Sequence, residues 1–109
     1  MGFFDVLTSV AKNAGEAAKN ANVKMIEETW KKLSSLSKNR LEGLIEEKSI
    51  SNTVGFLAYL RLRQFDSYSA NRLVNSEDEI KRKAASMKRA IEMHESDAID
   101  EIRREINRI

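Results

Sequence analysis

The longest strongly apolar stretch of the chain runs from Val54 to Leu60 and reads VGFLAYL. Continued to residue 70 at helical spacing, this segment has one apolar face and a set of residues that widen it. The face holds Val54, Leu57, Ala58, Phe65 and Tyr68, and the widening residues are Phe56, Tyr59, Leu60 and Leu62. A helix that is apolar on most sides must be covered on most sides. Residues 52–70 are therefore predicted to form the central helix, or to turn one face to another chain.

A strand is the alternative structure for this stretch, because apolar residues also alternate along it from Phe56 to Leu62. An isolated strand is not stable in water. The sequence contains no hairpin signal and no second strand to pair with it, so the helix is preferred.

The flanking sequence favours helices as well. The 109 residues include no proline, and glycine occurs only at positions 2, 15, 43 and 55, so few residues interrupt a helix. Ser49 to Asn52 is predicted to be a loop, with Ser51 or Asn52 as the N-cap of the central helix. Ser76 begins a capping box with Glu79.

The predicted fold is therefore a single all-α domain over residues 1–109. It is a helical bundle or hairpin assembly of three to five helices, with a long C-terminal helix. The helices are predicted near 3–21, 23–47, 52–70 and 76–108, with a kink or short turn near Asn22.

The first predicted helix carries its apolar residues at alternating spacings of four and three. They are Phe3, Leu7, Val10, Ala14, Ala17 and Ala21. This heptad spacing is typical of a helix that packs along another helix. Gly15 costs up to about 1 kcal/mol in a helix interior, so the helix near 3–21 is predicted to depend on a partner helix. Its bulky tip gives an alternative, a weak anchor on a membrane surface, although Asp5 lies within that tip.

The apolar stripe of the last predicted helix changes phase between Glu95 and Ala98. Unbroken, residues 76–109 would form a helix of about 50 Å, which overhangs a compact domain with a radius of gyration of about 13 Å. Either Ser96 caps a second helix, or residues 96–109 form an oligomerisation arm. We favour the arm, which predicts at least a dimer. Its candidate oligomer interface consists of Ile99, Ile102, Ile106 and Ile109.

Trp30 lies in the apolar stripe of the second predicted helix, with Ile26 and Leu33 at helical spacing. Large aromatic side chains dominate burial in a small core. The main core is therefore predicted to hold Trp30 and either Phe56 or Phe65.

The sequence shows no pattern of catalytic or metal-binding residues. The chain has no cysteine, so it has no thiol nucleophile, thiolate metal site or disulfide. His94 is the only histidine, and both a zinc protease helix and a di-iron bundle need a second one. We predict a partly buried structural role for His94. The chain is predicted to have no enzymatic activity, no cofactor, no metal and no small-molecule substrate.

The expected location is the cytoplasm. The absence of cysteine fits a reducing compartment, and residues 1–12 do not follow the pattern of a signal peptide. No apolar stretch approaches the ~20 residues that cross a bilayer.

One run of basic residues is free of acidic residues. It consists of Lys81, Arg82, Lys83, Lys88 and Arg89. At 100° per residue, Arg82 and Arg89 lie opposite the apolar stripe, so they face outward. We expect the arginines at 61, 63 and 72 to extend this surface if their helices are neighbours.

The sequence thus predicts a non-enzymatic, oligomeric interaction protein, such as an adaptor, inhibitor or regulator, whose partner is another protein. The alternative is a nucleic-acid-binding regulator that uses the basic run. The net charge is only +2, and no aromatic residue lies within the run to stack on bases, so nucleic acid is the second choice.

Overall fold

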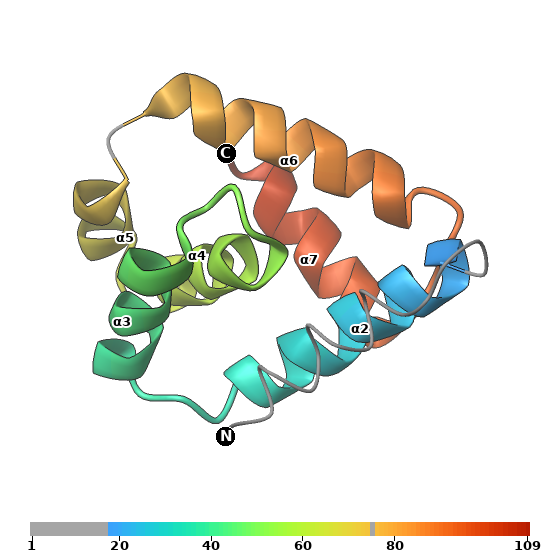
Figure 1. Cartoon of the computed structure of the whole chain (residues 1–109), viewed down its shortest axis with the longest axis horizontal. Coiled ribbons are helices and arrows are strands. Elements are labelled where there is room, and N and C mark those ends of the chain that lie inside the picture. Colours follow the sequence, from blue (N-terminus) through green and yellow to red (C-terminus); the bar gives the residue numbers. More distant parts are fainter. Residues whose placement is uncertain (1–17, 75) are drawn as a thin grey trace.

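The computed structural model describes residues 18–74 and 76–109, which form helices separated by short turns (Figure 1). The helices are α2 (Ala18–Leu33), α3 (Lys38–Lys48), α4 (Thr53–Phe65), α5 (Ser67–Leu73), α6 (Glu77–Ile91) and α7 (Asp97–Asn107). No strand occurs among these residues. The all-α prediction is confirmed, and the strand alternative between Phe56 and Leu62 is wrong. The predicted helix near 3–21 lies outside the described residues, apart from the part that begins α2.

α4 is the central helix, as its apolar sequence predicts. It packs against α3 and α5 on one side and against α2 and α7 on the other. α6 crosses above these helices, where it contacts α7 and α2 (Figure 1). The principal-axis extents are 37 × 32 × 24 Å, and none of the helices described between residues 18 and 109 overhangs the others.

Two of the predicted helices are each divided by a capping residue that the sequence analysis missed. Ser37 separates α2 from α3, and its side chain accepts a hydrogen bond from the Arg40 amide at 3.3 Å. Asp66 separates α4 from α5, and its Oδ1 accepts from the Tyr68 and Ser69 amides at 3.1 and 3.3 Å. These side chains satisfy amides that a helix start leaves without partners. The prediction of a turn near Asn22 is wrong, because α2 continues through that residue.

The long C-terminal helix is also wrong, since α6 ends at Ile91 and α7 starts at Asp97. The Ser96 hydroxyl accepts from the Ile99 amide at 3.1 Å, so the second-helix alternative describes the structure. Arg103 fixes the turn, because its Nη2 donates to the carbonyls of Ile91 at 3.1 Å and His94 at 3.0 Å. The last helix therefore folds back on its own chain instead of reaching out as an arm.

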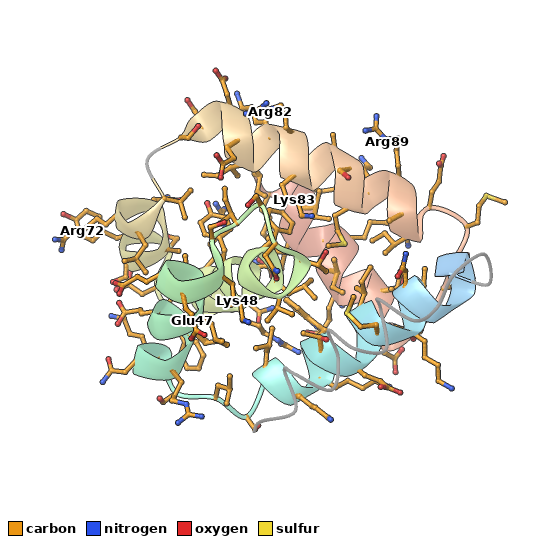
Figure 2. The ribbon with its side chains drawn as sticks, viewed as in Figure 1. Glu47, Lys48, Arg72, Arg82, Lys83 and Arg89 are labelled. Atoms are coloured by element: carbon orange, nitrogen blue, oxygen red, sulfur yellow. The ribbon has the colours of Figure 1, made fainter. Side chains whose placement is uncertain are left out.

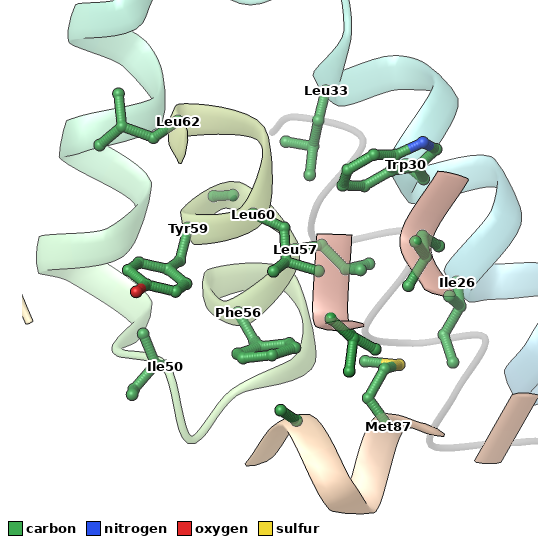
Figure 3. Packing of buried hydrophobic residues seen from close by; sticks show 14 of the residues in the cluster. Ile26, Trp30, Leu33, Ile50, Phe56, Leu57, Tyr59, Leu60, Leu62 and Met87 are labelled. Carbon is green, nitrogen blue, oxygen red and sulfur yellow. The ribbon is translucent and has the colours of Figure 1, made fainter. Parts of the chain in front are cut away.

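One continuous apolar core occupies the space between the helices (Figure 3). Trp30 and Phe56 are fully buried in it, which confirms the prediction for these two rings. The prediction for Phe65 is wrong, because its side chain is 58% exposed, and Tyr68, expected on the same face, is 69% exposed. The helix that was to carry both residues inward ends at Asp66, so they lie beside a corner of the chain.

Arg61 is buried in the most apolar helix, with only 8% of its surface exposed. Its guanidinium carbon lies 3.6 Å from the centroid of the Trp30 ring. Its Nε and Nη2 donate to the Trp30 carbonyl at 3.2 and 2.8 Å, and its Nη1 lies 3.5 Å from a carboxylate oxygen of Glu101. Burial lowers the pKa of Arg61, whereas the negative charges of Glu101 and Glu105 raise it. The residue stays cationic at neutral pH and joins α2, α4 and α7.

The turn between α3 and α4 brings two backbones together at Gly55. A Cβ added to Gly55 would overlap the carbonyl group of Ser49. Ser49 itself adopts φ 63° and ψ 162°, a conformation that favours glycine. Only a residue without a side chain fits at position 55.

We expect Trp30→Ala to lower the free energy of unfolding by about 3–5 kcal/mol, because it leaves a large cavity in the core. Phe65→Ala is the control, since the ring of Phe65 is mostly exposed, and its cost should stay below about 1 kcal/mol. Urea denaturation measures both. If Trp30→Ala lowered the free energy of unfolding as little as the control does, Trp30 would lie outside the main core.

Two glycine substitutions should have opposite effects. Gly55→Ala should destabilise the protein by about 1–3 kcal/mol, because the new methyl group forces α3 and α4 apart. Gly43 is exposed within α3, and a Cβ added there meets no atom within 4 Å, so Gly43→Ala should stabilise by about 0.5–1 kcal/mol through helix propensity. Thermal denaturation of both variants tests whether the backbone at Gly55 lies against Ser49. A higher midpoint for Gly55→Ala would refute this close approach.

Candidate partner-binding surface

The outer side of α6 carries four exposed cationic side chains, which we call the basic face: Lys81, Arg82, Lys88 and Arg89. The helix begins at the Ser76 N-cap, and acidic residues occupy its first turn, where the helix dipole favours them. Its apolar side chains, such as Ile80 and Met87, are buried against the core. That burial fixes the rotation of α6, so Arg82 and Arg89 point away from the molecule (Figure 2).

The basic face lacks ion pairs among residues 18–74 and 76–109. Within this part of the chain, the ion pairs join Lys38 to Asp66, Arg61 to Glu101, Arg103 to Asp100 and Arg108 to Glu105. Lys88 donates a hydrogen bond to the neutral Oδ1 of Asn107 at 3.2 Å. Lys38, Arg61 and Arg103 are thus each paired with a carboxylate, whereas the cations of the basic face are available to an external anion.

Lys83 differs from the other members of the predicted basic run. It is half-buried, and it lies on the side of α6 that faces the rest of the fold (Figure 2). Burial lowers the pKa of its ammonium group. The structure therefore separates Lys83 from the basic face.

The expected extension by three further arginines is wrong for Arg61 and Arg72, whereas Arg63 lines a hollow together with Lys81 of the basic face. Arg61 is buried against Trp30. Arg63 lies with its guanidinium carbon 5.8 Å from the centroid of Tyr59, and Arg72 lies at the same distance from Tyr68 on α5, far from Arg82 and Arg89 (Figure 2). The tertiary structure assigns each arginine to a different environment.

A hollow of about 320 Å³ adjoins the basic face, between α6 and α7. Its lining includes Ala85, Lys88, Arg89 and Arg103, with Glu92 at one side. The small side chain of Ala85 projects little from α6, so a partner's side chain can come close to the cations beside it. The basic face therefore adjoins a concave surface, which a partner's side chain could occupy.

A second hollow, of about 520 Å³, lies over α7 and carries charges of both signs. Its acidic residues are Asp97, Asp100, Glu101 and Glu105. Glu105 is buried and accepts from Gln64 Nε2 at 3.1 Å. No group of three or more histidine, aspartate or glutamate residues in the described part of the chain is arranged to hold a metal ion.

His94, predicted to be partly buried, does not lie on a helix. It occupies the turn between α6 and α7 and is half-buried. Its backbone carbonyl accepts the hydrogen bond from Arg103. No second histidine or cysteine exists in the sequence to form a site with it.

The predicted oligomer interface is largely inside the molecule. Ile99, Ile102 and Ile106 are buried in the core of their own chain, and Ile109 is partly buried against it. Their spacing of three and four residues serves the packing of α7 on its own chain.

The predicted membrane-surface tip near Phe3 lies outside the described residues. No helix in the described ranges is long and apolar enough to cross a membrane.

Comparison with protein-family models, with curated proteins and with solved structures gives no match to this chain.

The burial of Lys83 predicts a difference between two neighbouring lysines. Because burial lowers the pKa of Lys83 below the ordinary value of a lysine, the unfolded state binds more protons as the pH rises toward that ordinary value, and stability should rise with pH there. Lys83→Met should therefore raise the urea midpoint at pH 7, while Lys81→Met, at an exposed position, should leave it nearly unchanged. A fall in the midpoint for Lys83→Met would show that this ammonium group stabilises the fold.

Proposed function

We propose that this chain acts without catalysis, as an interaction protein that binds an acidic surface of a partner protein through the basic face of α6. The observation that carries the proposal is the grouping of exposed, unpaired cations on one side of a single helix, α6. Lys81, Arg82 and Arg89 have no carboxylate partner within the described ranges, whereas Arg61, Arg103 and Arg108 each have one. Exposed charges of one sign attract and orient a partner of the opposite sign.

The spacing of the two outermost arginines suits carboxylates on a helix. Arg82 and Arg89 are seven residues apart, so they project about 10 Å apart along the axis of α6. Ala85 and Ser86 between them are exposed and small, which lets a partner backbone approach. A partner helix with glutamates seven residues apart presents the same separation. Arginine binds carboxylates with two parallel hydrogen bonds, which favours a defined geometry over a diffuse one.

A protein partner fits this surface better than nucleic acid does. The acidic residues Glu77 and Asp78 lie at one end of the basic face and Glu92 at the other, all exposed. A phosphate backbone running along α6 would meet these carboxylates at both ends, whereas a short acidic segment fits between them. The exposed aromatic rings of Phe65 and Tyr68 are on α4 and α5, away from the place where bases would stack.

The proposed role is that of an adaptor, inhibitor or regulator in the cytoplasm. Oligomerisation remains part of the proposal, but residues 96–109, which were expected to form the oligomerisation arm, pack into the core of their own chain. The exposed rings of Phe65 and Tyr68 now offer the apolar surface for contact with a second chain.

The test uses two labelled probes of opposite type. One is a short helical peptide with glutamates seven residues apart, and the other is a random-sequence DNA duplex. We expect the wild-type chain to bind the peptide more tightly than the duplex in fluorescence anisotropy at about 0.15 M salt. Arg82→Glu combined with Arg89→Glu should weaken peptide binding at least about tenfold, because it places like charges opposite each other.

The matched control combines Lys24→Glu with Arg40→Glu, which changes the net charge equally at exposed positions of α2 and α3. It should bind the peptide as the wild type does, and all variants should keep their helical circular dichroism. Equal losses in both double variants would reduce the attraction to net charge alone and refute the proposal. Tighter binding of the duplex, with a steep dependence on salt, would replace it with the nucleic-acid alternative.

A further inference from the structure

A third hollow, of about 380 Å³, lies where α4, α5 and the start of α6 meet the end of the chain. We call it the Tyr59 hollow. We propose that it is a binding site for a small organic anion, with a carboxylate or phosphate group attached to an apolar body. Its volume falls within the range of small-molecule sites. The argument rests on the side chains that line it and is independent of the partner proposed for the basic face.

The floor of the hollow is a fixed polar group. Tyr59 is only 1% exposed, and its ring packs near Phe56 with 6.2 Å between the centroids. Its hydroxyl donates to Asn71 Oδ1 at 2.9 Å and accepts from Arg63 Nη1 at 3.3 Å. A hydroxyl held between two partners keeps both of them in place at the edge of the hollow.

Arg63 is the best-positioned cation of the site. Its Nη2 donates to the Arg108 carbonyl at 3.4 Å, and its guanidinium lies beside the Tyr59 ring. Its Nε is buried and has no acceptor in the described part of the chain. A guanidinium has five N–H donors, so Arg63 keeps donors to spare while its orientation is already set. Such pre-organisation reduces the entropy lost on binding an anion.

Two further cations line the same hollow. Lys81 comes from α6 and Arg108 from the residue after α7. Lys81 has no ion pair among the described residues, and Arg108 has only the 3.5 Å contact with Glu105. Glu77 is the one carboxylate side chain among the lining residues. Of the three cations, Arg108 is paired with Glu105, so Arg63 and Lys81 supply the surplus of positive charge over Glu77.

The lining of the hollow also includes apolar side chains, which indicate the rest of the ligand. They are Val74, Ile80 and Ile109, each from a different part of the chain. A free inorganic ion would leave these side chains in contact with water, whereas an anion with a ring or short hydrocarbon body covers them. The combination of fixed donors and aliphatic side chains in one lining favours an organic anion.

We test the site by following backbone amide shifts of the ¹⁵N-labelled chain during titration with three probes. Phenyl phosphate and 3-phenylpropionate carry the two candidate anionic groups, and 2-phenylethanol is the uncharged analogue. Both anions, or one of them, should shift the amides of Val74, Ile80 and Lys81 in a saturable manner, and the alcohol should not. The anion that binds with the higher affinity identifies the acidic group that the site prefers.

Substitutions compare a cation of the basic face that lines the hollow with one that does not. Lys81→Gln should weaken anion binding at least about fivefold, because it removes an unpaired cation of the site. Arg82→Gln is the control, since Arg82 points away from the molecule (Figure 2), and it should leave the affinity unchanged. Arg63→Gln should abolish binding. If that variant does not fold, the comparison of Lys81→Gln with Arg82→Gln still decides the outcome.

Three results would overturn the proposal. The first is the absence of saturable shifts with either anion at millimolar concentration. The second is equal binding of 2-phenylethanol, which would show an apolar crevice without anion recognition. The third is an equal loss of affinity in Lys81→Gln and Arg82→Gln, which would indicate general attraction to the positive surface.

Discussion

The stacking of the Arg61 guanidinium on the Trp30 ring is the interaction on which the arrangement of the helices depends. A buried cation is costly unless it is paired and hydrogen-bonded. Here the cation lies in the central helix, its ring comes from α2, and its carboxylate, Glu101, comes from α7. The carbonyl that accepts its two hydrogen bonds also belongs to Trp30. Three helices must therefore be in place together before this charge is satisfied.

The same network explains why the charges on the surface are unevenly paired. Glu101 and Glu105 of α7 turn toward Arg61, Gln64 and Arg108, so these carboxylates are not available to the cations of α6. α4 is covered by α2, α3, α5 and α7. α6 is left to cover the remaining side of the core with one apolar face. Its outer face keeps its positive charges without neutralising partners in the described part of the chain.

The basic face and the Tyr59 hollow share Lys81. An anion in the hollow would neutralise part of the positive charge at one end of the basic face, and an acidic partner on that face would compete for the same ammonium group. Occupation of one site would then weaken the other, and thermodynamic linkage makes this effect reciprocal. The two proposed sites thus offer a route by which a small anion regulates binding of a protein partner.

The sequence by itself determined the helical class, the central place of the segment around Val54 to Leu62, and the cap at Ser76. It narrowed the cap of the central helix to Ser51 or Asn52, and the structure shows Asn52. These features depend on local hydrogen bonds and on the periodicity of apolar residues, both of which can be read along the chain. It also predicted the burial of Trp30 and Phe56 and the outward direction of Arg82 and Arg89.

Only the tertiary structure decided where the long helices break and what the arginines do. Ser37, Asp66 and Ser96 each can cap a helix or lie within one, and the choice depends on whether the chain must turn back to bury its next apolar face. The final isoleucines fit an interface between chains and a core equally well by their spacing. Arg61, Arg63 and Arg72 are alike in sequence, but contact with Trp30, Tyr59 or Tyr68 gives each a different role. Such contacts join residues far apart in the chain, and no local pattern specifies them.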